Sequence, residues 1–513
     1  MTIYARDWID YHASVNADKT AMIDLHSQRQ FTYSQMNDRV AQVAGFLKSK
    51  GIEPGDRVAF LCLNTTDVME LVFGCWRIGA VCLALNFRLA PPEVAFILND
   101  SEASMIVVDA PFAPVAEATK PLTDVAHWIS TDGMGGDSSY EQGLKNATPI
   151  YDMHPQSVED QCLLMYSSGM TGSPKGVIIT HVMLEHVYAS SARMGNFTPR
   201  NVSLNNMPLF HIGGLNVTAL PTIWIGGTCV IMRMFEPGAT LAAISDPALD
   251  INLIFMVPAA FNAMKEHPNM PTSDFSRLEV ALCGAETVPE SLMHFWLEKG
   301  IAIQEGYGMT ETAAAGCMVA KVDIPEKIGS CGRPLMHSQV KIVDENGEVC
   351  PPNTPGEILF KGAAITPGYW RNPEANSKCF VDGWFRSGDI GRMDEDGYIY
   401  IEDRVKDMYI SGGENIYPAE IEGLLYELPE LLEVSVIGVP DEKFGEAGCI
   451  VAVFKADKSL TLEQFQAHLT GRIAKFKIPT YLHVIDALPR GGTGKVLKFE
   501  LRKSVPEALG LKT

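Results

Sequence analysis

The segment TYSQMNDRVAQVAGFLKSK, residues 32–50, is followed at 57–63 by RVAFLCL, and this pair of segments indicates the fold class. Four apolar residues of the first segment recur at the spacing of one helix face: Met36, Val40, Val43 and Leu47. Thr32 and Gln35 form a capping-box pattern at its start, and Gly51 marks its end. The second segment is a short, continuous apolar run, as in a strand buried on both faces.

The same alternation continues along the chain. Residues 67–78 and 92–98 have helical spacing, while AVCLAL at 80–85 and SMIVVD at 104–109 are further apolar runs. Repeated units of this kind predict a parallel sheet that is covered by helices on both faces. Residues 160–340 continue in this style. We therefore expect an α/β fold with a large N-terminal region of βα-type sheets.

The character of the sequence changes between residues 340 and 402. Apolar and polar residues alternate in two segments of this region, VKIVDENGEVCPPNTPGEILFKG and DEDGYIYIEDR. The alternating runs are joined by NG, PG and DG turns, which predicts a small antiparallel β subdomain. A last unit begins near Asp407 and is expected to be a small α+β domain. Its expected strands are 434–439 and 449–454, and its expected helices are 419–428 and one starting at 462.

Composition narrows the classes of function. The chain has 513 residues, 46% hydrophobic and 20% charged, which is enough for several globular cores. Its net charge of −21 argues against nucleic-acid binding and against a basic membrane-surface patch. Eleven scattered cysteines without a C-x-x-C pair fit free thiols in the cytoplasm. Asp7 and Asp10 disfavour a signal peptide, and the glycines and proline within the uncharged stretch 212–232 disfavour a transmembrane helix.

A loop rich in glycine, serine and threonine, YSSGMTGSPKG at 166–176, follows an apolar run. Its glycines permit close approach of the backbone, and its hydroxyls and Lys175 suit phosphate oxygens. The Walker A pattern fails here, because Pro174 and Gly176 stand where glycine and serine or threonine are required. A second candidate, GGTGKV at 491–496, also fails. Taken alone, the first loop is equally consistent with a phosphate site and with a plain flexible loop.

This loop resembles the phosphate-binding loop of the adenylate-forming superfamily, whose usual pattern is close to S/T-S/G-G-S/T-T-G-x-P-K-G. Four further segments resemble signatures of that superfamily in the expected order: GYGMTET (306–312), WFRSGDIG (384–391), IEDRVKDMYISGGENIYPAEIE (401–422) and PRGGTGKVLK (489–498). Secondary matches are PLFHIGG (208–214), LCGAE (282–286) and GYWRNPEA (368–375). The resemblance covers nearly the whole chain. Its SGGEN and FHIGG segments are most similar to those of acyl-CoA synthetases that act on fatty or aromatic acids, including 4-coumarate-CoA-type ligases.

The resemblance implies a reaction in two steps. A carboxylate attacks the α-phosphate of ATP to give an acyl-adenylate and pyrophosphate, and coenzyme A then takes the acyl group and releases AMP. The implied cofactors and substrates are ATP, Mg²⁺, coenzyme A and a small carboxylic acid. No nucleic-acid partner is expected, and a homo-oligomer stays open.

The resemblance also assigns residues in an N-terminal domain at 1–406. The β- and γ-phosphates would be held by Ser167, Ser168, Gly169, Thr171, Gly172 and Lys175. Met170 replaces a usual threonine, so that position lacks a hydroxyl. Thr310 would bond the α-phosphate, and Glu311 would hold Mg²⁺, which prefers oxygen ligands. Adenine and ribose would be bound by Gly284, Ala285, Glu286, Tyr307, Gly308, Asp389 and Arg404.

Within that last set, two residues have specific implied roles. Tyr307 would lie against the adenine ring, and Asp389 would accept hydrogen bonds from both ribose hydroxyls.

A mobile C-terminal domain at 407–513 is implied to carry Lys495, whose charge would stabilise the transition state of adenylation. Lys406 would be the hinge between two closed arrangements of the domains. Ser411, Gly412 and Gly413 would then shape the tunnel for the pantetheine arm of coenzyme A.

The carboxylic acid itself is the least defined part of the prediction. His211 either flanks the carboxylate or is a buried structural histidine, and we favour the first interpretation. The acyl pocket is expected among the residues after His211 and in the stretches 256–261 and 313–318, as the resemblance implies. Its expected members are apolar or small residues: Ile212, Gly213, Val257, Cys283, Gly306 and Ala313. Such a lining favours an apolar monocarboxylate such as a fatty acid, with an aryl or arylpropenoic acid as the alternative.

Three other classes share parts of this pattern. An amino-acid adenylation domain would need an acidic residue near 208–214, where His211 and Ile212 stand instead. A luciferase-like monooxygenase usually ends in a peroxisomal S-K-L signal, whereas this sequence ends in Leu-Lys-Thr. A nucleotide sensor on the same scaffold would not need Lys495.

Overall fold

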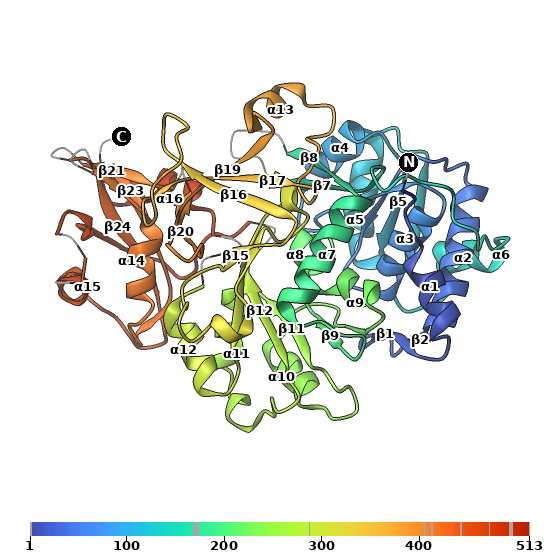
Figure 1. Ribbon diagram of the computed structural model, residues 1–513, viewed down its shortest axis with the longest axis horizontal. Coiled ribbons are helices and arrows are strands. Elements are labelled where there is room, and N and C mark those ends of the chain that lie inside the picture. The colour runs from blue at the N-terminus through green and yellow to red at the C-terminus, as the bar shows by residue number, and fades with distance from the viewer. Residues whose placement is uncertain are drawn as a thin grey trace.

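The structure is a computed structural model that describes residues 3–167, 174–286, 288–404, 407–411, 414–441, 444–470, 472–473, 475–491 and 496–511. Within these residues the strands form four sheets. In Figure 1 the sheet that contains most of the N-terminal strands lies on the side of the molecule that carries the N-terminus. The sheet of the C-terminal region lies on the side that carries the C-terminus. The predicted architecture, a large N-terminal α/β region and a small C-terminal α+β domain, is confirmed.

The first sheet has six strands in the order β6-β5-β3-β4-β7-β8. Their bounds are β3 (Arg57–Leu61), β4 (Val81–Ala84), β5 (Ala103–Asp109), β6 (His127–Thr131), β7 (Gln161–Ser167) and β8 (Lys175–Thr180). All neighbours are parallel except β7 and β8, which form an antiparallel pair. The predicted phosphate loop therefore connects two antiparallel strands.

Helices cover both faces of this sheet. One face packs against α1 (Trp8–Val15), α2 (Tyr33–Ser49), α3 (Thr66–Arg77) and α6 (Ser139–Asn146), and the other against α4 (Pro91–Asp100) and α5 (Ala113–Thr119). Alternate strand residues enter the two cores: Val58 and Phe60 the first, Ala59 and Leu61 the second. The predicted capping box of α2 is present, since the Thr32 side chain accepts from the backbone N–H of Gln35.

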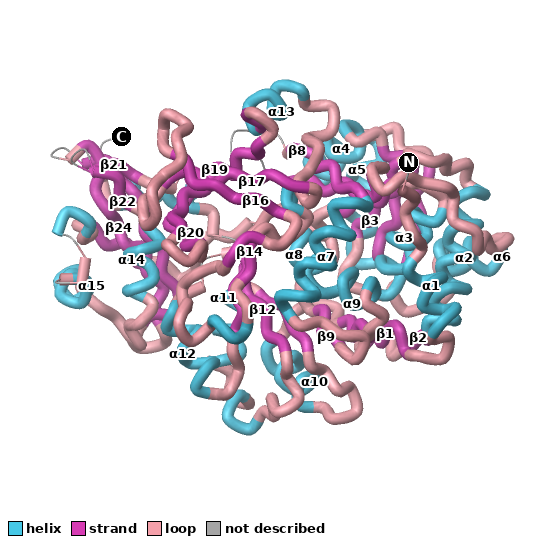
Figure 2. The backbone as a smooth tube through the Cα atoms, in the orientation of Figure 1, coloured by secondary structure: helices cyan, strands magenta, loops and turns pink. Residues whose placement is uncertain are grey.

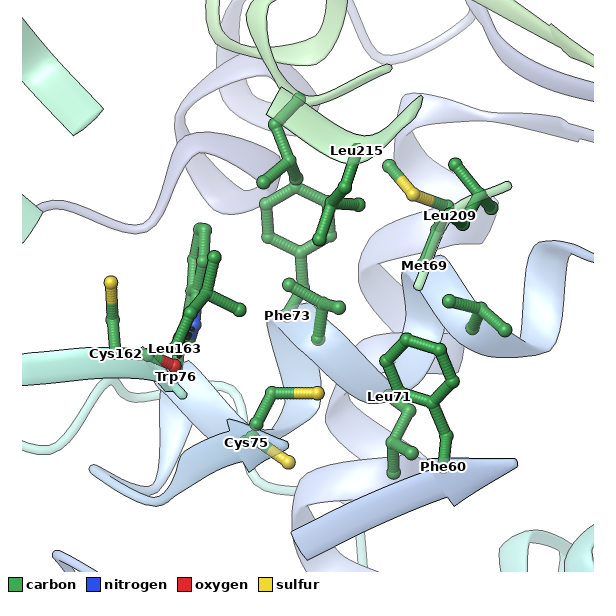
Figure 3. Packing of buried hydrophobic residues seen from close by; sticks show 14 of the residues in the cluster. Phe60, Met69, Leu71, Phe73, Cys75, Trp76, Cys162, Leu163, Leu209 and Leu215 are labelled. Atoms are coloured by element: carbon green, nitrogen blue, oxygen red, sulfur yellow. Dashed lines mark hydrogen bonds between the residues drawn. The ribbon is translucent and has the colours of Figure 1, made fainter. Parts of the chain in front are cut away.

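Figure 3 shows the larger of these two cores, in which α3 packs against strands of the sheet. Phe73 and Trp76 meet edge to face at 5.3 Å between ring centroids. The indole N–H of Trp76 donates to the Cys162 carbonyl at 2.9 Å, so its one polar group is satisfied. Leu209 and Leu215 enter the same core from a later part of the chain, which joins the first sheet to the second.

The second sheet has nine strands in the order β15-β14-β13-β12-β11-β9-β10-β1-β2. Their bounds are β1 (Thr20–Asp24), β2 (Gln30–Thr32), β9 (Val202–Asn205), β10 (Thr228–Ile231), β11 (Leu253–Met256), β12 (Val280–Gly284), β13 (Ile303–Tyr307), β14 (Cys317–Met318) and β15 (Arg333–Pro334). Its helices are α7 (His181–Gly195), α10 (Pro237–Ser245), α11 (Pro258–Lys265) and α12 (Glu290–Glu298). The central strands are parallel, and β2, β14 and β15 pair antiparallel at the two edges.

The uncharged stretch 212–232 belongs to this second unit. It forms α8 (Ile212–Gly214), η3 (Leu215–Ala219), α9 (Leu220–Trp224) and then β10, as the glycines and proline predicted. Among the described residues, none of the helices is long and apolar enough to cross a membrane. The short helical turns elsewhere are η1 (Ala110–Phe112), η2 (Lys120–Leu122), η4 (Met270–Thr272), η5 (Thr310–Thr312), η6 (Lys321–Asp323) and η7 (Lys475–Lys477).

The third sheet is antiparallel throughout, as predicted for this region. It comprises β16 (Ser338–Val343), β17 (Gly356–Gly362), β18 (Phe380–Val381), β19 (Trp384–Met393) and β20 (Ile399–Arg404), with α13 (Pro373–Cys379) beside it. In Figure 2 strands β16, β17 and β19 run between the first sheet and the C-terminal region.

The segment 366–370 ties this third sheet to the first. The N–H of Ile178 donates to the Gly368 carbonyl at 3.1 Å, and the N–H of Trp370 donates to the Gly176 carbonyl at 2.7 Å. The segment therefore pairs with β8 along the edge of the six-stranded sheet.

The fourth sheet lies in the C-terminal region. It contains β21 (Tyr409–Ser411), β22 (Glu414–Ile416), β23 (Leu431–Asp441), β24 (Gly445–Phe454) and β25 (Tyr481–Val484), with α14 (Pro418–Leu425), α15 (Leu462–Leu469) and α16 (Lys498–Ala508). Sequence analysis did not predict β21, β22, β25 or α16. Helices α14 and α15 cover one face and α16 the other. The predicted boundary at 406 falls on residues outside the described ranges.

Candidate functional site

A cavity of about 430 Å³ lies where the first three sheets meet. Many of the predicted site residues line it: Ser167, Lys175, His211, Ile212, Gly213, Cys283, Gly284, Ala285, Gly306, Gly308, Thr310, Glu311 and Asp389. They come from segments more than 200 residues apart in the chain, such as β7 and β19. The fold thus brings the predicted phosphate, ribose and acyl residues to one place.

The flanks of the predicted phosphate loop are the last residue of β7 and the first of β8. Ser167 and Lys175 are paired directly across this antiparallel ladder. The Lys175 ammonium lies 5.3 Å from the ring centroid of Tyr369, within cation–π range. The other residues predicted for the loop, Ser168, Gly169, Thr171 and Gly172, lie outside the described residues.

Glu311 is a buried carboxylate in η5, with 9% of its surface exposed. The hydroxyl of Tyr369 donates to Glu311 Oε1 at 2.8 Å. The backbone N–H of Thr366 donates to the Glu311 carbonyl at 2.8 Å, which fixes the main chain as well. Burial and the adjacent Glu311 carboxylate raise the pKa of Tyr369, so its hydroxyl keeps its proton at neutral pH.

These contacts fit a magnesium ion that is held partly by substrate. Within the described ranges, three or more His, Cys, Asp or Glu side chains nowhere gather as a metal cluster. Mg²⁺ is commonly bound through one or two carboxylates together with substrate phosphates. Glu311, which lines the same cavity as Ser167 and Lys175, offers a carboxylate of that kind.

The predicted ribose carboxylate, Asp389, is also held in place by a tyrosine. Asp389 is 5% exposed, and its Oδ2 accepts a hydrogen bond from the Tyr307 hydroxyl at 2.6 Å. The backbone N–H of Asp389 donates to the Ser387 hydroxyl at 3.0 Å. Burial and the Asp389 carboxylate raise the pKa of Tyr307 well above its usual value. Tyr307 does not line the cavity, so its observed contact is with Asp389.

His211 begins α8 and lines the cavity. Its Nδ1 accepts a hydrogen bond from the backbone N–H of Gly213 at 3.2 Å. In a neutral imidazole one nitrogen accepts and the other carries the proton, so this contact places the proton on Nε2. His211 therefore presents a hydrogen-bond donor rather than an acceptor at its other nitrogen.

In two turns beside the cavity, alanine residues adopt backbone conformations with positive φ, which are usual for glycine. Ala285 has φ +73°, and Ala313 and Ala314 have φ +53° and +122°. Such conformations are costly for alanine and cluster at functional sites. The backbone of Gly308 packs directly against the second turn. A Cβ added to Gly308 would lie 2.0 Å from the Ala314 carbonyl oxygen, so a larger residue at 308 would displace this turn.

The cavity has two chemically different walls. The charged wall comes from β8, η5, α13 and the third sheet: Lys175, Glu311, Glu357, Lys378, Arg386 and Asp389. The apolar wall comes from η3 and the nine-stranded sheet: Val217, Phe255, Leu282, Cys283 and Met318, with Gly284 and Gly306 between them. Of the predicted acyl residues, Val257 and Ala313 do not line the cavity.

Glu305 is a buried acid on the opposite face of β13. Gln304 and Gly306 line the cavity, whereas Glu305 and Tyr307 do not, as the alternation of a strand requires. Burial raises the pKa of Glu305 from 4.5 to about 8, although the Val288 N–H lowers it. Glu305 therefore keeps its proton to a higher pH than an ordinary glutamate does.

Tyr369 is the principal residue that sequence reasoning missed. It stands in GYWRNPEA, one of the secondary matches, and the resemblance assigns no role to it. Phe255, Gln304 and Ser387 also line the cavity without a predicted role, and Met318, the last residue of the predicted stretch 313–318, lines it as well. Phe255 resembles any buried apolar residue, so the sequence carries no distinguishing signal for it.

The remaining predicted residues lie elsewhere. Lys406, Gly412, Gly413 and Lys495 are outside the described residues. Ser411 is buried in β21, and Arg404 ends β20, where its backbone pairs with Asp389. Glu286 does not line the cavity; its carboxylate lies 3.9 Å from the guanidinium of Arg490, which belongs to the C-terminal region.

Comparison with known proteins agrees with this geometry. The model of the AMP-binding enzyme family matches residues 9–370, and that of the AMP-binding enzyme C-terminal domain matches residues 420–495. The chain is 38% identical over 505 residues to a feruloyl-CoA synthase of Amycolatopsis sp, covering 97% of this chain and 98% of that protein. It is 36% identical over 492 residues to a long-chain-fatty-acid–CoA ligase of Mycobacterium tuberculosis, covering 96% of each. A solved structure of an anthranilate CoA ligase in complex with anthranoyl-AMP has a TM-score of 0.93 at 26% identity, covering 99% of this chain and 98% of that one.

Proposed function

The chain belongs to the AMP-binding enzyme family, and on that premise we propose that it activates a carboxylic acid with ATP and transfers the acyl group to coenzyme A. The observation that carries the proposal is the cavity with two walls. Its charged wall holds a cation, Lys175, and two buried carboxylates, Glu311 and Asp389. Its apolar wall adjoins them, which supports a site where a nucleotide and the acid bind next to each other.

In the first step a carboxylate oxygen of the acid attacks the α-phosphorus of ATP. A carbon–oxygen–phosphorus linkage forms, the bond from the α-phosphorus to the bridging oxygen breaks, and pyrophosphate leaves. His211 donates from Nε2 to the carboxylate and orients it, while Lys175 neutralises charge on the leaving phosphates. Mg²⁺, when bound by Glu311, supplies further positive charge to the phosphates.

In the second step the sulfur of coenzyme A attacks the acyl carbon. A thioester forms, the bond to the AMP oxygen breaks, and the thiol proton is released. We place Lys495 in the first step and residues 411–413 along the path of the pantetheine arm in the second. This division requires a mobile domain at 407–513 that turns about Lys406 relative to 1–406.

The apolar wall supports a monocarboxylate with an apolar body over a dicarboxylate or an amino acid. A fatty acid and an aryl or arylpropenoic acid both satisfy this description. We place the reaction in the cytoplasm, because all eleven cysteines are free thiols and nine of them are buried.

The test is product analysis with ATP, Mg²⁺ and a panel of monocarboxylic acids, with and without coenzyme A. We expect AMP and pyrophosphate as products, and acyl-CoA only when coenzyme A is present. Glu311→Gln should reduce AMP formation at least tenfold, whereas Glu298→Gln, at an exposed position at the end of α12, should not. Formation of ADP and phosphate would refute the proposal.

A further inference from the structure

Strand β19 bulges where it passes the cavity. The pairing of β17 with β19 shifts register between Glu357 and Leu359, so that one residue of β17 stands opposite the three residues 387–389 of β19. All three of these residues line the cavity. A β-bulge bends its strand and re-aims a side chain, and bulges are frequent next to active sites. The bulge at 387–389 therefore determines how Asp389 meets the cavity.

The bulge interrupts the hydrogen-bond ladder between β17 and β19. Gly388, at its centre, has φ +71°, a left-handed conformation that glycine adopts easily. Its backbone N–H donates to the side chain of Glu357, with 3.3 Å between the nitrogen and Oε1. A hydrogen bond from an N–H to a carboxylate is stronger than one between neutral groups. Glu357 thus supplies an acceptor where the ladder is interrupted.

The same carboxylate also pairs with an arginine. Oε2 of Glu357 accepts from Nε of Arg386 at 2.9 Å and from its Nη2. The side chain of Glu357 is 12% exposed, whereas that of Arg386 is 50% exposed. Ion pairs that are open to solvent contribute little to stability. The Arg386 side chain can follow a change at position 357 through solvent, but the Gly388 N–H belongs to the main chain and cannot.

Two further contacts hold the residues on either side of Gly388. The Ser387 hydroxyl accepts from the backbone N–H of Asp389 at 3.0 Å, and the Tyr307 hydroxyl donates to Asp389 Oδ2 at 2.6 Å. Neither of them holds the Gly388 N–H. Because Gly388 directly precedes Asp389, a change in its backbone orientation moves the Asp389 carboxylate.

We propose that Glu357 is a positioning residue: it fixes the bulge at 387–389 so that Asp389 accepts hydrogen bonds from the ribose hydroxyls of ATP. This inference rests on the proposed function, because it assumes that the cavity binds ATP with its ribose at Asp389. Glu357 acts through the backbone of Gly388 and not through contact with the nucleotide. Its effect is therefore on how well the site distinguishes a nucleotide that carries both ribose hydroxyls.

The test uses two conservative variants that separate the length of the side chain from its charge. Glu357→Asp keeps a negative charge for Arg386, but it is one methylene shorter and withdraws the carboxylate from the Gly388 N–H. Glu357→Gln keeps the length and an acceptor oxygen for Gly388, but it loses the charge. A residue that acts through Gly388 is impaired by the first change and not by the second. A residue that acts only through its ion pair shows the reverse.

The measurement is the dissociation constant of ATP, of 2′-deoxyATP and of 3′-deoxyATP, by calorimetry with Mg²⁺ and without an acid. We expect the wild type to bind ATP about tenfold or more tightly than either deoxynucleotide, because each loses a donor to a charged acceptor. This ratio should fall toward one in Glu357→Asp and stay near the wild-type value in Glu357→Gln. Glu236→Asp is the matched control and should keep the ratio. The Glu236 carboxylate also accepts from a glycine N–H, that of Gly238 at 3.0 Å, but it caps α10 and does not line the cavity.

The outcomes separate the two proposals. The role of Glu357 is supported only if the ratio falls in Glu357→Asp and not in Glu357→Gln. Any other pattern would overturn it, and so would a wild type that does not distinguish ATP from its deoxy forms. A ratio of two dissociation constants does not depend on the folded fraction, so a loss of stability alone leaves it unchanged. Binding is measured without an acid, so a failed prediction here leaves the AMP-forming reaction intact. Absence of AMP formation with every acid would instead refute the proposed function.

Discussion

Replacing Tyr369 by phenylalanine removes one hydroxyl beside Glu311 and keeps the ring. That hydroxyl donates to Glu311 Oε1 at 2.8 Å, and the ring faces the Lys175 ammonium at 5.3 Å. Phenylalanine retains the ring face for Lys175 and the packing against Val177 and Phe385. The variant also removes the acceptor of the Cys379 thiol, whose sulfur lies 4.0 Å from the Tyr369 hydroxyl oxygen, and it keeps the ring contacts. Its main effect is therefore on the setting of the Glu311 carboxylate.

The size of the effect follows from the kind of hydrogen bond. A bond from a neutral hydroxyl to a charged carboxylate contributes about 1.5–3 kcal/mol. At about 1.4 kcal/mol for each factor of ten, this corresponds to about a 10- to 150-fold change in an equilibrium constant. Glu311 has other interactions besides this one, so we expect the lower part of the range, about tenfold, in the affinity for Mg²⁺ with ATP.

The assay is AMP formation at saturating acid, titrated with Mg²⁺ at fixed ATP. We expect Tyr369→Phe to need about ten times more Mg²⁺ for half-maximal rate, with a smaller change at saturating Mg²⁺. Tyr151→Phe is a matched control, because Tyr151 also donates to a carboxylate, Asp38 at 2.9 Å, but on an exposed surface. The pKa of Tyr369 is raised, so its hydroxyl remains a donor throughout the neutral range and the difference should not depend on pH there.

An unchanged Mg²⁺ requirement together with a lower melting temperature would refute the reasoning. It would mean that the hydroxyl contributes to stability alone and that Glu311 is held sufficiently by its remaining contacts.

Three further predictions concern other parts of the chain. Lys175→Ala should weaken ATP use at least tenfold without lowering the melting temperature; a collapse in stability would make the loop structural. Lys495→Ala should abolish formation of the acyl-adenylate and still convert supplied acyl-adenylate to acyl-CoA, measured as two single-turnover reactions; equal losses would contradict a two-arrangement mechanism. Glu305→Gln should stabilise the protein increasingly from about pH 4.5 to about pH 8. The folded chain retains the Glu305 proton there and the unfolded chain has lost it, so the wild type loses stability as pH rises. A difference in melting temperature that is constant with pH would contradict this.

Local pattern was sufficient to predict much of the fold. Helix α2 has its predicted capping box, and the short apolar runs became β3, β4 and β5 because only a sheet covered on both faces buries such runs. Helix α16 was missed because basic residues and Pro506 interrupt its apolar face. Strand β25 was missed because it is short and only partly buried.

The sequence also predicted one part of the candidate site and not another. The motif residues Glu311 and Asp389 were identified by their neighbours in sequence, and they line one cavity. The tyrosines that hold them, Tyr369 and Tyr307, act through contacts across 58 and 82 residues. Sequence spacing carries no information about such long-range pairs. The contact between the Glu357 carboxylate and the Gly388 N–H likewise spans 31 residues, and only the folded chain brings the two groups together.

The segment 366–370 has a consequence for solubility. Strand β8 is the last strand of the six-stranded sheet, and the segment supplies hydrogen bonds along it. An uncovered edge offers unpaired N–H and C=O groups to other chains and invites aggregation. The same five residues carry Tyr369 to Glu311. Sequence changes in this segment are therefore constrained twice, because a substitution that spares the carboxylate contact can still expose a sheet edge and reduce the yield of soluble protein.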